Sequence, residues 1–92
     1  MSVVIVGGND RMVNKYKELC KAYSCKAKVF TQMPAKFSNQ IGKPDLMILF
    51  TNTVAHKMVL TAMTEAEKNN IKVERSHSSS ASALKKILAQ HC

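Results

Sequence analysis

Two short runs without a polar side chain constrain the fold most. Residues 3–6 are rich in β-branched side chains and precede two glycines, and Leu46–Phe50 is apolar throughout. Runs of this length and composition are typical of strands that are covered on both faces. Such strands lie inside a parallel sheet that has helices on each side. The sequence therefore predicts an α/β domain built around these two strands.

Four other segments carry apolar residues at helical spacing. The first begins at about Met12, and the second is short and opens at Met33-Pro34. The third covers residues 54–69 and the fourth covers residues 81–90. Apolar residues spaced by three and four lie on one face of a helix, so each segment predicts a helix with one buried side.

The third of these helices has the strongest pattern. Its expected core stripe, with the two residues that widen it, is Val54, Met58, Leu60, Ala62, Met63 and Ala66. Thr53 precedes the stripe. Because a threonine hydroxyl can accept a bond from a free amide of the first helical turn, we expect Thr53 to be the N-cap.

Two further strands complete the pattern. Residues 25–30 alternate small or apolar side chains with lysines, which is typical of a half-exposed edge strand, and residues 71–74 form the last strand. Alternation of strands and helices favours right-handed crossovers in a parallel sheet. We therefore expect one domain over residues 1–92, with a four-stranded parallel sheet in the order 2-1-3-4 and helices on both faces.

Charge and composition limit the partners. The net charge is +8, yet aromatic residues make up only 5% and the basic residues include only two arginines. We favour a solvated lysine-rich surface over nucleic-acid binding, because single strands need aromatic stacking platforms. No apolar run is long enough to span a membrane. The three cysteines form no CxxC pair, which favours free thiols and a cytoplasmic location.

Three polar loops are expected to follow the first, third and fourth strands. They cover residues 7–11, 51–56 and 75–80. In parallel sheets, ligands bind at the carboxyl ends of the strands, near the point where strand order reverses. Both arginines (Arg11 and Arg75) and two of the histidines (His56 and His77) fall in these loops. We therefore place the functional surface there.

The residue types of these loops suit an anion. A glycine pair permits close backbone approach, helix amino ends offer free N–H groups, and arginine adds a forked donor. His56 is a candidate ligand to metal or haem, a proton carrier or a donor to an anion. The predicted ligand-binding residues are Gly7, Gly8, Asn9, Asp10, Arg11, Thr51, Asn52, Thr53, His56, Arg75, Ser76, His77, Ser78 and Ser79.

Each motif also has a purely structural interpretation. The glycine pair can form a tight turn before a helix that Asn9 or Asp10 caps, and His56 can bond a loop carbonyl. The serines can be caps and turn residues. We predict no catalytic residue, because there is no GxSxG elbow and Asp10 is the one acid in the three loops.

The order and spacing of these motifs resemble a bacterial family, domain-of-unknown-function family 2325. The matching pieces are Val4-Ile5-Val6-Gly7-Gly8 with Arg11, Tyr16 and Leu19, Pro44-Asp45, Thr53-Val54-Ala55-His56, and Arg75-Ser76 with the following serines. The resemblance covers nearly the whole chain. It implies a Rossmann-like, flavodoxin-like fold, a homodimer and, in some relatives, bound haem. The family pattern has a histidine after the glycine pair, where this chain has Asn9.

The leading hypothesis is a non-enzymatic ligand-binding or sensory module for an anionic small molecule or cofactor, in which a homodimer encloses the ligand between two such faces. One version is haem, with His56 or His77 on the iron and arginine on the propionates. The alternative is an enzyme that acts on a phosphorylated or carboxylated metabolite with His56 as acid or base.

Overall fold

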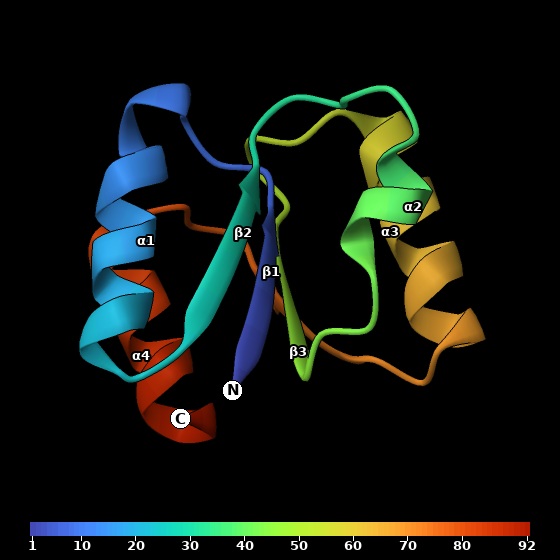
Figure 1. Ribbon diagram of the computed structural model, residues 1–92. Coiled ribbons are helices and arrows are strands. Elements are labelled where there is room, and N and C mark those ends of the chain that lie inside the picture. Colours follow the sequence, from blue (N-terminus) through green and yellow to red (C-terminus); the bar gives the residue numbers. More distant parts are fainter.

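A four-stranded parallel sheet forms the middle layer of the computed structural model, which describes residues 1–92 (Figure 1). Its strands are β1 (Ser2–Val6), β2 (Lys26–Phe30), β3 (Leu46–Phe50) and β4 (Lys72–Ser76). They lie in the order β2-β1-β3-β4, and all three pairings are parallel. The predicted α/β class, strand order and parallel arrangement are confirmed.

Helices cover both faces of this sheet. The short 3-10 helix η1 (Asp10–Met12) leads into α1 (Val13–Ala22), which packs with α4 (Ala81–His91) on one face. On the other face lie α2 (Phe37–Ile41) and α3 (His56–Lys68) (Figure 1). The predicted three-layer arrangement is therefore correct.

The two central strands are buried on both sides. Val3 and Ile5 contribute to the core under α1 and α4, whereas Val4 and Val6 contribute to the core under α2 and α3. Every residue of Leu46–Phe50 is buried, and its side chains alternate between the same two cores. Because successive side chains of a strand point to opposite faces, a two-sided strand needs an unbroken apolar run.

Two predicted helix starts are wrong. The second helix begins at Phe37 rather than at Pro34, because Lys36 adopts a left-handed conformation with φ 55° directly before it. The third begins at His56 rather than at Val54, and its N-cap is Ala55 instead of Thr53. Val54 still packs against the core beneath α3, but it does so from the loop that precedes the helix.

Three further details differ from the sequence-based expectation. Leu60 is 56% exposed, so it does not widen the buried stripe of α3. Strand β4 continues to Ser76, which moves Arg75 and Ser76 from the loop into the strand. Helix α4 continues past the predicted end at residue 90 to His91, whose Nε2 lies 3.4 Å from Oε1 of Glu74 and links the end of the helix to β4.

The cysteines behave as expected. Cys20 and Cys25 are buried, Cys92 is exposed, and all three are free. Burial raises the pKa of the Cys20 thiol to about 11, so it stays protonated and unreactive near neutral pH. None of the helices has the length and apolar character that crossing a membrane requires.

Candidate functional site

The loops after β1, β3 and β4 meet at one end of the sheet, and we call residues 7–9, 51–55 and 77–80 the loop cluster. The Gly8 N–H donates to the carbonyl and to the hydroxyl of Thr53, each at 3.1 Å. The Thr51 N–H donates to the Ser76 carbonyl at 2.9 Å. The strand order thus brings together most of the predicted site residues, because neighbouring strands end side by side.

The glycine pair has a packing role. Gly7 and Gly8 have φ values of 101° and 90°, which side-chain-bearing residues rarely adopt. A Cβ on Gly7 would lie 2.9 Å from the Phe50 carbonyl oxygen, and one on Gly8 would lie 2.7 Å from the Tyr16 ring. Their N–H groups donate to Phe30 and Thr53. These amides are occupied, so the pair does not form an anion cradle.

Tyr16 contacts the loop cluster from the protein core. Its side chain is fully buried in α1, its ring lies 5.3 Å from the Phe50 ring, and its hydroxyl donates to the Ser79 carbonyl at 2.6 Å. Its apolar spacing predicts the buried position, but the sequence gives no indication of the contact with a loop 63 positions away. Tyr16 therefore fixes the β4–α4 loop relative to the glycine pair.

Asn9 and Asp10 also have structural partners. Asn9 caps η1 by accepting a hydrogen bond from the Arg11 N–H at 2.9 Å. Of the two residues predicted as caps, Asn9 and Asp10, it is therefore Asn9 that caps the helix. The Asp10 carboxylate accepts hydrogen bonds from the side chains of Thr31 and Gln32, just after β2. The Thr31 hydroxyl, followed by the Gln32 amide, lowers the pKa of Asp10 below its usual value of 3.8.

This lowered pKa makes stability depend on pH. Because the folded protein holds the ionised form of Asp10, the added stability is present above pH 3.8 and is lost as pH falls through the lower folded pKa. We expect Thr31→Val to raise the Asp10 pKa toward 3.8, as measured by carboxyl NMR titration. Asp10→Asn should remove this part of the acid sensitivity. A Thr31→Val protein with an unchanged Asp10 pKa would contradict the assignment.

The serines mainly build the start of α4. The Ser80 hydroxyl accepts from the Ala83 N–H at 3.2 Å and is the N-cap. The Ser78 hydroxyl donates to that of Ser80 at 3.1 Å, and the Ser76 hydroxyl donates to the Ser78 carbonyl at 2.7 Å. These contacts are those of the structural interpretation, in which serine is a cap and turn residue.

The amino end of α3 lies at this end of the sheet and, unlike that of α4, has no capping side chain. Ala55 makes no side-chain cap. The Thr53 hydroxyl already accepts from Gly8 and donates to Oδ1 of Asn52 at 3.2 Å. The N–H groups of His56 and Lys57 consequently have no acceptor within the protein. Both side chains are exposed, and Lys57 is a cation that the sequence analysis did not single out.

The other predicted polar residues divide into two groups. Arg11 and His77 are exposed at the same end of the molecule as the loop cluster. Arg75 is not part of it, because its side chain extends along β4 toward Met63 of α3, with 3.8 Å between Nη2 and Sδ. The exposed His56 imidazole makes no hydrogen bond within the protein, so no side chain orients it as a general base.

Comparison with protein families shows which family the chain belongs to. The model of the family described as "Uncharacterized protein conserved in bacteria (DUF2325)" matches residues 2–91. The chain belongs to this family. The resemblance found in the loop motifs is thereby confirmed over nearly the whole chain. Comparisons with curated proteins and with solved structures gave no match.

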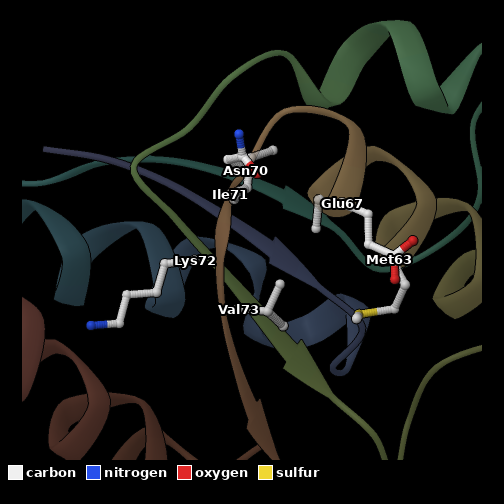
Figure 2. Close-up of a pocket in the computed structure, with 7 residues that line it drawn as sticks. Met63, Glu67, Asn70, Ile71, Lys72 and Val73 are labelled. Atoms are coloured by element: carbon white, nitrogen blue, oxygen red, sulfur yellow. The ribbon is translucent and has the colours of Figure 1, made fainter.

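The geometry of this DUF2325 domain bears on haem. A haem site needs an axial ligand beside an apolar slot for the macrocycle. His56 and His77 are exposed on the polar end of the molecule. The pocket of the protein, about 420 Å³ in volume, lies elsewhere, between α3 and β4, and is lined by Met63, Ala66, Glu67, Asn70, Ile71, Lys72 and Val73 (Figure 2). The residues around His56 and His77 in the single chain therefore do not fit haem.

Proposed function

We propose that this DUF2325 domain is a non-enzymatic module that binds a small molecule through a phosphate or carboxylate group at the amino end of α3. The observation that carries the proposal is the pair of N–H groups, on His56 and Lys57, that have no acceptor. The positive end of the helix dipole and free amides together favour an anion. The helix follows β3, beside β1, at the point where strand order reverses.

The surrounding charges support an anion. Lys57 lies in the same turn of α3, and Arg11 and His77 are exposed at the same end of the protein. The acid of these loops, Asp10, is bound to side chains after β2. A net charge of +8 adds a long-range attraction for anions. Because all three cysteines are unpaired, we also propose that the domain works in the cytoplasm.

A capping substitution tests this proposal. We expect Ala55→Asp to place a carboxylate on the free amides of α3, which should stabilise the fold by about 0.5–2 kcal/mol and weaken phosphate binding by about tenfold or more. The measurement is an amide NMR titration with inorganic phosphate, in which the N–H groups of His56 and Lys57 should shift most in the parent protein.

The matched control places the same charge at the opposite end of the same helix. Asn69 is the C-cap of α3, so Asn69→Asp changes the net charge equally but leaves the amino end alone. Phosphate binding should be nearly unchanged in this variant. If Ala55→Asp and Asn69→Asp weaken binding equally, or if millimolar phosphate moves neither amide of the parent, the proposed site is wrong.

Material that copurifies with the untagged protein provides an independent test of ligand class. Native mass spectrometry should detect a phosphate- or carboxylate-bearing metabolite that is lost from the Ala55→Asp variant. Because haem absorbs strongly in the Soret region, an absorption spectrum of the same sample tests the haem prediction directly. Stoichiometric haem that survives in Ala55→Asp would overturn the preference for a simple anion.

A further inference from the structure

Strand β4 leaves one edge of the sheet open. The Ser76 carbonyl accepts from the Thr51 N–H, so Ser76 directs its main-chain groups toward β3. Alternate residues of a parallel strand direct their main-chain groups to the same side. Val73 and Arg75 therefore direct theirs away from the sheet, where the protein offers no partner strand.

The helices do not close this edge. Helix α3 contacts Arg75 through Met63, and α4 contacts Glu74 through His91, but neither helix covers the strand completely. The effect on burial is clear, because β3 is buried throughout whereas no residue of β4 is buried. An accessible strand with unpaired N–H and C=O groups is a template for another strand.

We propose that the strand that pairs here is β4 of a second copy of this chain, antiparallel, with Val73 opposite Val73 of the partner subunit. The two valines then exchange both main-chain hydrogen bonds, as a hydrogen-bonded antiparallel pair does. The same register sets Lys72 opposite Glu74 of the partner subunit, and two-fold symmetry repeats this pair. Opposite charges in directly facing positions stabilise a sheet.

Neighbouring registers are disfavoured by charge. The outward-facing main-chain groups stay paired only if one strand slides past the other by two residues. Sliding in one direction sets Glu74 opposite Glu74 of the partner subunit. The corresponding shift in the other direction sets Lys72 opposite Lys72 of the partner subunit. Like charges in directly facing positions are destabilising. The sequence of β4 thus selects one self-complementary register.

The opposite edge of the sheet has no such register. The outward-facing side of β2 is flanked by Lys26 and Lys28, whose side chains lie on the same face of the strand. Self-pairing centred on Ala27 would set these two lysines against each other, and neighbouring registers pair each lysine with itself. Lysines protect an edge in this way. Of the two edges, β4 is the one suited to a second copy.

The groove beside β4 adds complementarity on the face toward α3. Figure 2 shows Val73 and Lys72 pointing to opposite sides of the strand, with Val73 on the side of Met63 and Glu67. In the proposed register, Arg75 of the partner subunit lies opposite Ile71. That position adjoins the groove residue Glu67, so a cation meets an acid there. Val73 and Val73 of the partner subunit contact each other beside the apolar part of the groove.

This dimer differs from the one that we expected from the sequence. Antiparallel β4 strands create one continuous sheet in which the two loop clusters lie at opposite ends. Each amino end of α3 then remains open to solvent, and no ligand is enclosed between two loop faces. The inference is independent of the proposed anion site, because no residue of that site takes part.

A charge exchange tests the register. Sedimentation equilibrium should show a reversible dimer of the parent protein. Lys72→Glu and Glu74→Lys should each weaken dimerisation by about tenfold or more, and the double variant should return within about threefold of the parent. Two controls should keep the dimer: His91→Ala, which removes the Glu74 contact within the chain, and Lys28→Glu on β2. Loss of the dimer in both single variants without recovery in the double variant would refute this register.

Hydrogen exchange gives a second, backbone-level measurement. The N–H groups of Val73 and Arg75 should exchange more slowly as protein concentration rises. The Phe30 carbonyl faces β1, so the N–H groups of Ala27 and Val29 point outward from β2. Because no second copy pairs with that edge, these two groups should exchange at the same rate at every protein concentration. A monomer at every concentration, or a dimer without protection of Val73, would overturn the proposal.

Discussion

Gly7→Ala is expected to lower the free energy of unfolding by about 3 kcal/mol, a large effect for one methyl group. The added Cβ would lie 2.9 Å from the Phe50 carbonyl oxygen and 3.1 Å from Cβ of Val54. The carbonyl belongs to the end of β3, where the sheet ladder fixes it, so it cannot move aside cheaply. The φ of 101° adds backbone strain for a residue with a side chain.

Gly42→Ala separates these two causes. Gly42 also has a positive φ, of 66°, but a Cβ there meets nothing within 4 Å. We expect this variant to lose only the conformational part, about 1–2 kcal/mol, because residues with a side chain rarely adopt φ 66° with ψ −145°. Urea unfolding of the two variants gives the comparison. If both lose the same free energy, the close contact between the β1 and β3 ends is not what requires glycine at position 7.

The architecture follows from the sequence because its main determinants are local. Leu46–Phe50 has no polar residue and must be covered on both faces, and the lysines of β2 mark an edge. The start of α3 was mispredicted for a physical reason. Thr53 is a good capping residue, but its hydroxyl accepts from Gly8, 45 positions earlier in the chain, so it is not available to the helix. Contacts of this separation are absent from local sequence patterns.

The candidate site shows the same limit. The strand order predicted that the three polar loops meet at one end of the sheet, and they do. The role of each residue depends on which side of its strand it faces and on contact partners that are distant in the sequence. Strand β4 ends at Ser76 rather than at residue 74, so Arg75 lies in the strand and contacts Met63, and the serines are used by the start of α4. The N–H groups of His56 and Lys57 have no acceptor because α3 lacks a side-chain cap, a feature that side-chain motifs do not reveal.

Tyr16→Ala is expected to lower the free energy of unfolding by about 3–5 kcal/mol, and binding at α3 should survive under folding conditions. The ring is fully buried between α1 and the sheet and contacts Phe50, so truncation leaves a cavity in the core beneath α1 and α4. It also leaves the Ser79 carbonyl without its donor. Chemical denaturation gives the free energy, and phosphate titration gives the binding.

Tyr16→Phe isolates the hydrogen bond within that total. The ring stays in place while the bond to Ser79 is lost, so we expect a loss of about 1–2 kcal/mol. The matched control is Tyr23→Phe, since the Tyr23 hydroxyl makes no hydrogen bond within the protein, and it should be nearly neutral. Faster amide exchange at the start of α4 in Tyr16→Phe alone would follow from release of the β4–α4 loop. Equal losses in Tyr16→Phe and Tyr23→Phe would mean that the hydroxyl of Tyr16 does not hold that loop, and that the loop cluster is positioned by the strand ends and Thr53 alone.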